Sequence, residues 1–268
     1  MSISAKSTPA FELENVTFRY PESTALDALT LSIFPGECVA ILGANGSGKS
    51  TLLRVLAGLC FPESGSVKFF GNPLTEATLN QELTCMEFRR KVGVIFQNPD
   101  VQLFNATVFD EIAFGPLQMG WRKPEILERV HLAMQEQGIA HLKDRPPHRL
   151  SGGEKKRVAL ASVLVLDPDV LLLDEPTAAL DPQSQGHIID FLFGCAGRKT
   201  VITTTHSLEV AQEIADRCIV LENGRLAGSG PVANILQDNA LLERTHLLHV
   251  HRHRHPTGAV HAHPHRHF

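Results

Sequence analysis

Residues 38–51 read CVAILGANGSGKST. The first five residues, Cys38 to Leu42, are all apolar, as expected for a strand that is buried on both faces of a sheet. The glycine-rich stretch from Gly43 to Ser50 fits the phosphate-binding pattern GxxxxGK[ST] and stands where that pattern works, between a strand and a helix. There, backbone N–H groups and the positive end of the helix dipole attract phosphate oxygens. The stretch therefore predicts an α/β fold that binds a nucleotide.

The loop itself supplies a set of candidate binding residues. Lys49 is expected to reach the β- and γ-phosphates, and the hydroxyl of Ser50 is expected to bind Mg²⁺. The alternative, a glycine-rich turn that binds nothing, is disfavoured because the full pattern stands in its proper place. The predicted phosphate contacts are Gly43, Ala44, Asn45, Gly46, Ser47, Gly48, Lys49, Ser50 and Thr51.

The flanking sequence predicts the rest of the α/β fold. Residues 11–33 contain two stretches of alternating apolar and polar residues, which indicate antiparallel strands with half-buried faces. Apolar strand patterns recur at 92–96, 170–173 and 200–204, with helical segments between them, so a sheet covered on both faces is expected. The insert 98–168 has helical character and includes a predicted helix over 123–137. Further predicted features are Pro124 in that helix's first turn and a hairpin turn at Asn223-Gly224.

A second acidic element follows the predicted strand Val170 to Leu173. The strand places Asp174 and Glu175 at the carboxyl edge of the sheet, where ligands of α/β proteins bind. Asp174 is expected to help hold Mg²⁺, and Glu175 to orient or deprotonate an attacking water molecule. An Asp-Glu pair alone is more often a polar strand end, but the phosphate-binding loop favours the functional interpretation.

The composition excludes several classes of function. The chain has 268 residues, of which 43% are hydrophobic and only 6% are aromatic, which argues against an RNA-stacking surface. Its longest apolar run, Val158 to Leu166, is far shorter than the ~20 residues of a membrane span. Five cysteines without a closely spaced pair argue against disulfides and a cysteine zinc site. The net charge of −4 includes three arginines and no acidic residues in 246–268, so the rest of the chain is more acidic still and suits nucleic acids poorly.

A third motif identifies the family. Residues 150–157 read LSGGEKKR, and Ser151 and Glu154 form a capping box that starts a helix. Together with GANGSGKST before it and LLLDEPTAALD after it, this motif resembles the nucleotide-binding domain of ABC ATPases over residues 10–237. The resemblance implies an α/β P-loop fold with a RecA-like mixed sheet core, an N-terminal antiparallel β subdomain, and a helical subdomain over about 98–168 that carries the signature. Residues 1–9 would be an extension, and 238–268 a tail.

The resemblance also implies roles for particular residues. ATP and Mg²⁺ would be bound, and the signature residues Ser151, Gly152 and Gly153 would contact ATP held by a second subunit in a head-to-tail dimer. That second subunit is either another copy of this chain or a related one. Further implied roles are adenine stacking by Tyr20, sensing of Mg²⁺ and the γ-phosphate by Gln97, crossing to the partner by Asp181, and γ-phosphate contact by His206.

Two positions depart from the family pattern. Glu154 stands where glutamine is usual and adds a negative charge near the nucleotide, and Ser207 follows His206 where aspartate is frequent. Both departures leave the motifs recognisable, and their effect on hydrolysis stays open.

The segment after Gln97 resembles a narrower group, the energy-coupling-factor ATPases of cobalt, nickel and vitamin importers. In that group this region contacts the coupling helices of a transmembrane scaffold subunit, so the candidate docking residues are Val101, Leu103 and Phe104. An apolar cluster beside a loop is more often part of the core. The expected partners are therefore transmembrane scaffold and substrate-binding subunits, with a peripheral location on the cytoplasmic face of the membrane.

The tail carries alternating histidines in two sets. In an extended chain every second residue lies on one face, so each set is expected to bind Ni²⁺, Co²⁺, Zn²⁺ or Cu²⁺. The composition predicts disorder from residue 246. The histidines are His249, His251, His253, His255, His261, His263, His265 and His267.

These features favour an ATPase that powers uptake of cobalt or nickel, with cobalt first on family resemblance. Three alternatives stay open: a vitamin importer of the same type, an ABC ATPase without a transport role, and a metal buffer that acts through the tail.

Overall fold

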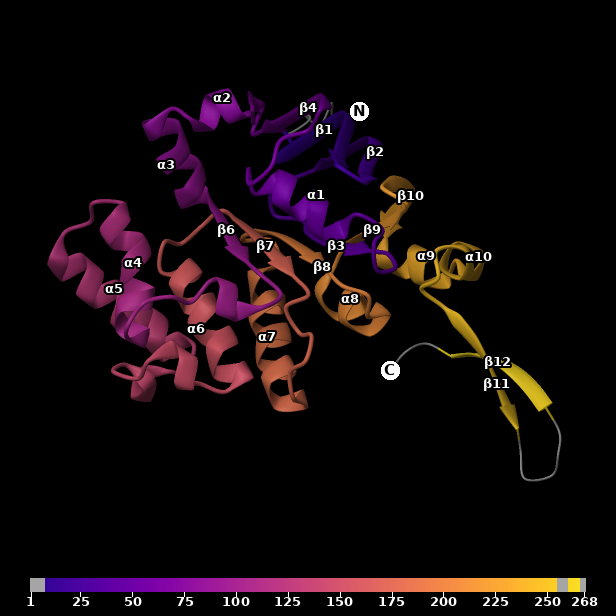
Figure 1. Cartoon of the computed structure of the whole chain (residues 1–268). Coiled ribbons are helices and arrows are strands. Elements are labelled where there is room, and N and C mark those ends of the chain that lie inside the picture. Colours follow the sequence, from indigo (N-terminus) through magenta and orange to yellow (C-terminus); the bar gives the residue numbers. More distant parts are fainter. Residues whose placement is uncertain (1–7, 255–259, 266–268) are drawn as a thin grey trace, which may run out of the picture. The chain divides into compact units, whose positions relative to one another are not determined.

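The structure is a computed structural model that describes residues 8–254 and 260–265, with side chains described as far as residue 248. The chain divides into two compact units. The first combines the chain up to Leu74 with the chain from Thr203 onward, and the second spans Thr75–Ile202 (Figure 1). The helical segment predicted over 98–168 lies inside the second unit.

An antiparallel sheet opens the first unit and confirms the predicted β subdomain. Its strand order is β2-β1-β4-β5. Phe11 pairs with Ile33 on one side and with Phe69 on the other, and Phe11 and Ile33 are both fully buried. The strands are β1 (Phe11–Tyr20), β2 (Ser23–Ile33), β4 (Ser64–Phe69) and β5 (Asn72–Pro73).

The first unit also contains mixed strand pairing. Strand β3 (Cys38–Leu42) is buried at all five positions and pairs in parallel with β9 (Arg217–Glu222). Strand β10 (Arg225–Pro231) pairs with β9 in the antiparallel direction. The turn between them holds Asn223 and Gly224 at φ 49° and 77°, which confirms the predicted hairpin.

The packed part of the first unit continues past residue 237, where the sequence placed its end. Helix α8 (Leu208–Ile214) follows strand β8 (Thr200–Thr204), and helices α9 (Val232–Gln237) and α10 (Asn239–Arg244) follow β10. Leu242, Leu247 and Leu248 are buried in one apolar cluster with residues of β3 and β9. Because these leucines are buried, the packed part of the chain extends to Leu248.

The histidine-rich segment forms two strands where the sequence predicted disorder. Strands β11 (His249–Arg254) and β12 (Val260–His265) pair in the antiparallel direction (Figure 1). Backbone pairing satisfies N–H and C=O groups without an apolar face, so composition alone missed it. His255 and His267 lie outside the described residues.

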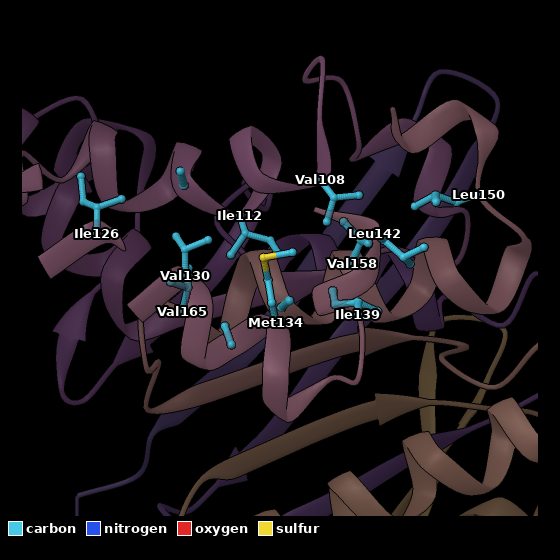
Figure 2. Packing of buried hydrophobic residues seen from close by; sticks show 13 residues of the cluster. Val108, Ile112, Ile126, Val130, Met134, Ile139, Leu142, Leu150, Val158 and Val165 are labelled. Atoms are coloured by element: carbon cyan, nitrogen blue, oxygen red, sulfur yellow. The ribbon is translucent and has the colours of Figure 1, made fainter. Parts of the chain in front are cut away.

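The second unit is built around a helical core. The helix predicted over 123–137 is α5 (Lys123–Glu136), with Pro124 in its first turn. Thirteen buried residues between Val108 and Val165 form its apolar core, in which α4 (Val108–Gln118), α5 and α6 (Gly152–Leu164) pack together (Figure 2). The helices are α2 (Glu76–Leu79), α3 (Glu82–Lys91), η1 (Pro99–Val101), α4 (Val108–Gln118), α5, η2 (Ala140–Leu142), η3 (Pro147–Arg149), α6 (Gly152–Leu164) and α7 (Pro182–Cys195).

Two parallel strands complete the second unit. Strand β6 (Val92–Ile95) pairs with β7 (Val170–Asp174), so their carboxyl ends meet at one edge. Strand β8 (Thr200–Thr204) begins in this unit and ends in the first. Among the described residues, no helix has the length and apolar character of a membrane span.

Candidate functional site

The phosphate-binding loop has the backbone that its glycines predict. Helix α1 (Lys49–Leu56) begins directly after Gly48. Gly43, Gly46 and Gly48 have φ values of 155°, 82° and 103°, a region that other residues rarely adopt. A Cβ atom at Gly48 would lie 2.4 Å from the carbonyl oxygen of Ala25, whereas one at Gly46 would meet nothing within 4 Å. The loop thus packs closely on one side and is open on the other.

Polar groups of this loop fit a bound phosphate. The ammonium group of Lys49 donates to the carbonyl oxygens of Gly43 (2.7 Å) and Ala44 (3.1 Å), which holds it over the loop. The hydroxyl of Ser47 is buried and has no hydrogen-bond partner in the described structure. A buried orphan hydroxyl is costly unless a ligand satisfies it, so its position supports the prediction of a nucleotide.

Tyr20 lies beside the helix that starts at this loop. Its hydroxyl accepts a hydrogen bond from Arg54 (3.1 Å) and lies 3.4 Å from the hydroxyl of Thr51. The ring contacts Phe18 edge-on and is 37% exposed. A half-exposed ring next to α1 is available for stacking on a base.

His206 follows β8 in the first unit. The preceding residue, Thr205, donates its N–H to the carbonyl of Ile41, near the end of β3 (3.1 Å). His206 is exposed, and Ser207 caps α8 by accepting from the N–H of Val210. Since serine and aspartate are both good N-caps, the Ser207 departure preserves the helix start.

The two acidic residues stand at the carboxyl end of β7 in the second unit. Asp174 ends the strand, and Glu175 is 8% exposed with φ 45°. A bulky residue in this left-handed region is strained, and such strain gathers at functional sites. Gln185 holds the loop that follows by donating to the carbonyls of Thr177 and Leu180.

The signature motif forms the predicted capping box at the start of α6. Ser151 accepts from the N–H of Glu154, whose carboxylate accepts from the N–H of Ser151 (2.7 Å). These hydrogen bonds lower the pKa of Glu154, and the charges of Arg145 and Arg157 act in the same direction. The extra negative charge at this position is therefore compensated within the chain.

The structure brings the signature motif next to Asp181. Asp181 caps α7 by accepting from the N–H and hydroxyl of Ser184, which lowers the pKa of Asp181. A Cβ atom at Gly153 would lie 2.4 Å from the Ser184 hydroxyl oxygen. The signature motif and Asp181, which are both predicted to face the partner subunit, therefore both lie against Ser184.

Gln97 follows β6, and its side chain is exposed. Its backbone carbonyl accepts a hydrogen bond from Lys156 (2.8 Å), a residue that the sequence reasoning missed. Lys156 is only 2% exposed, and burial lowers its pKa to about 8 against the raising effect of Asp174 and Glu175. The spacing in the sequence could have indicated that Lys156 is buried, because it lies on the same face of the helix as Ala159 and Leu160, which are both buried.

The three candidate docking residues divide into two kinds. Val101 and Phe104 are 69% and 67% exposed, and Phe104 contacts the ring of Phe114 edge-on at 5.0 Å. Leu103 instead packs against the helical core. Among residues with described side chains, no His, Cys, Asp and Glu groups gather into a metal-binding cluster.

Together these elements define a class of protein. A family model described as ABC transporter matches residues 26–178. The chain is 56% identical over 245 residues to the nickel import ATP-binding protein NikO of Rhodobacter capsulatus, covering 90% of this chain and 96% of the relative. The chain belongs to the ABC transporter family as an ATP-binding subunit, an enzyme that hydrolyses ATP to drive transport.

Further relatives narrow the class to importer ATPases. The energy-coupling factor transporter ATP-binding protein EcfA of Carboxydothermus hydrogenoformans is 45% identical, covering 89% of this chain and 86% of the relative. The solved structure of cbiO1 from Clostridium perfringens, part of the CbiONQ transporter complex, matches with a TM-score of 0.75 and 36% identity. That match covers 90% of this chain and 95% of the other. This likeness confirms the α/β fold predicted from the motifs.

Proposed function

We propose that this chain is the motor subunit of an energy-coupling-factor importer for nickel or cobalt ions. The observation that carries the proposal is the 56% identity to NikO across nine-tenths of the chain, combined with the Gln97–Phe104 segment. This relative's name favours nickel, whereas the family resemblance stated from the sequence put cobalt first. On this proposal the subunit would sit peripherally on transmembrane partners.

The catalytic roles follow from the chemistry of the side chains. Lys49 and the loop N–H groups would bind the β- and γ-phosphates, with His206 contacting the γ-phosphate. Ser50, Gln97 and Asp174 offer the hard oxygen ligands that suit Mg²⁺, which would neutralise charge on the phosphates when bound. Glu175 would orient the attacking water and accept its proton.

We further propose that two copies act as a head-to-tail dimer. Ser151, Gly152 and Asp181 are exposed, although they belong to the motifs that the family resemblance assigns to the nucleotide. In the proposed dimer these residues contact ATP that the partner subunit holds, so they are exposed in a single chain. Closure on ATP and opening after hydrolysis would then move the attached membrane subunits.

The docking surface is assigned to Val101 and Phe104 with the neighbouring Phe114. Changing Val101 and Phe104 to serine should leave basal ATP hydrolysis intact and weaken co-purification with the membrane subunits. Leu103 is left unchanged in this test, because it packs against the helical core. Normal co-purification of the double variant would contradict the assignment.

The decisive experiment measures cellular uptake of radioactive nickel and cobalt. The chain is co-expressed with its membrane subunits, and wild type is compared with Glu175→Gln and with Glu213→Gln, an exposed control on α8. We expect uptake of one metal to be lost only in Glu175→Gln. Absence of uptake for both metals in wild type, with ATP hydrolysis intact, would favour the vitamin importer or the ATPase without a transport role.

A second candidate function concerns the histidine-rich hairpin. Its register pairs His249 with His265, His251 with His263, and His253 with His261. Residues opposite each other in an antiparallel pair lie on the same face, so all six positions share one face of the ribbon. This register favours one shared site for a divalent transition metal over two separate sites.

Calorimetric titration with Ni²⁺ tests the shared site. Truncation before His249, which leaves Leu247 and Leu248 in the core, should abolish tight binding and leave ATP hydrolysis unchanged. Replacing only the three histidines of β11, or only those of β12, by alanine should each abolish tight binding. Half the stoichiometry at unchanged affinity in either variant would instead show two independent sites.

A further inference from the structure

The Gln97–Phe104 segment is anchored at its start by a lysine of the signature helix. The Lys156 ammonium group donates to the backbone carbonyls of Phe96 (3.0 Å) and Gln97 (2.8 Å). The side chain is almost fully buried, so these bonds are shielded from water and the cost of losing either partner is high. All three residues belong to the second unit, as do the residues discussed below.

Other contacts hold the rest of the segment. Lys155, the neighbour of Lys156, pairs with Asp100 at 2.6 Å, although that carboxylate is 59% exposed. The side chain of Gln102 accepts a hydrogen bond from the N–H of Phe96. The carboxylate of Glu111 accepts from the N–H groups of Phe104, at the segment's end, and of the next residue, Asn105. Of these anchors, only Lys156 binds the backbone of Gln97 itself.

Lys156 also lies within electrostatic range of Asp174, which ends β7, and of Glu175, which follows it. The carboxylates of Asp174 and Glu175 both act on its ammonium group. The signature helix and the backbone of Gln97 therefore meet at one buried cation, and the charges of Asp174 and Glu175 act on that cation. Such a cation can fix the geometry of groups that must align on one phosphate and one water molecule.

We propose that Lys156 is a positioning residue, which sets the place of Gln97 relative to Asp174 and Glu175 and makes the signature helix and the Gln97 segment move together. The inference rests on the proposed role of Gln97 in sensing Mg²⁺ and the γ-phosphate. It adds a specific coupling element: motion at the exposed residues Val101 and Phe104 reaches α6 through the carbonyl contacts of Lys156.

Steady-state ATP hydrolysis by the full chain tests this role. Lys156→Met keeps the aliphatic stem and removes the donors, so kcat should fall about tenfold or more. The KM for ATP should change less than about threefold, because the phosphate-binding loop is untouched. Lys156→Arg, which retains N–H donors, should recover most of the lost kcat.

A matched control separates positioning from general loss of packing. Lys199 also donates to a backbone carbonyl in the same unit, that of Pro168 (2.7 Å), away from the Gln97 segment. Lys199→Met should keep the wild-type kcat. Equal losses in Lys199→Met and Lys156→Met, or no recovery with arginine, would overturn the inference.

A double-mutant cycle with Gln97→Ala tests whether Lys156 acts through Gln97. If it does, Gln97→Ala combined with Lys156→Met should lose no more activity than Gln97→Ala alone, whereas multiplied losses would show independent action. A large loss of ATP hydrolysis in Gln97→Ala with none in Lys156→Met would contradict the inference about Lys156 and leave the proposed role of Gln97 in place. A large loss in Lys156→Met with none in Gln97→Ala would instead remove the proposed role of Gln97.

Hydrogen exchange supplies a readout that does not depend on activity. In Lys156→Met, exchange should quicken at the amides of residues 97–101 that carry an N–H group (Gln97, Asn98, Asp100 and Val101), while those of α4 and α5 stay protected. Unchanged exchange at 97–101, or faster exchange across the whole helical core, would contradict a local anchor.

Discussion

At the scale of single residues, backbone conformation decides what the phosphate-binding loop tolerates. Gly48 has φ 103°, and a Cβ atom there would approach the Ala25 carbonyl to 2.4 Å. We therefore expect Gly48→Ala to lower the free energy of unfolding by about 2 kcal/mol or more. Because the first turn of α1 would shift, ATP binding should weaken as well.

The control for this prediction is another glycine in a helix. Gly186 lies inside α7, and a Cβ atom there would meet nothing within 4 Å. Gly186→Ala should raise the free energy of unfolding by about 0.5 kcal/mol, as usual for glycine in a helix interior. Chemical denaturation of both variants checks the pair, and equal stability of the two would refute the strain argument.

Residue-scale predictions from the sequence succeeded where a motif constrains the backbone. The glycines of the loop, the cap at Ser151 and the turn at Asn223 all have the conformations that their patterns require. Lys156 was missed because its role comes from contact with carbonyls 59 and 60 positions away in the chain. No local pattern encodes which carbonyls a buried lysine will meet.

At the scale of elements, the capping box of α6 makes a testable contribution to stability. The folded protein lowers the pKa of Glu154 from its ordinary value of 4.5. The stability that this carboxylate contributes is therefore present above pH 4.5 and is lost as pH falls through the lower, folded-state pKa. Since the side chain is partly exposed, we expect a contribution below about 1 kcal/mol.

Glu154→Gln provides the measurement. The amide oxygen can still accept from the Ser151 N–H, so only the charge-dependent part of the capping interaction is removed. The difference in free energy of unfolding between wild type and variant should be largest near pH 7 and shrink below pH 4.5. A difference independent of pH would show that the charge contributes nothing to the cap.

Element boundaries also show where sequence reasoning ends. The strand 38–42 was predicted at its observed bounds, because an unbroken apolar run between glycines has few alternatives. Helix α10 and the buried pair Leu247 and Leu248 were assigned to the tail. Their burial depends on a cluster with β3 and β9, strands that are distant in the sequence.

At the scale of the whole molecule, the proposed head-to-tail dimer predicts complementation between two inactive chains. Lys49→Ala disables the phosphate-binding loop. Gly152→Asp places a negative charge where the partner's ATP would lie, and a Cβ atom at Gly152 meets nothing within 4 Å, so the chain itself should fold normally. In a mixed dimer, one site combines both defects, and the other is intact.

Mixing the two variants should therefore restore ATP hydrolysis to about a quarter of the wild-type rate, because half of randomly mixed dimers carry one intact site. The control mixes Lys49→Ala with Glu175→Gln. Both residues act on ATP bound by their own chain, so every mixed dimer keeps two defective sites and no activity should return. Recovery in the control, or none in the first mixture once mixed dimers are shown to form, would refute the head-to-tail arrangement and with it the assignment of the signature residues to the partner's nucleotide.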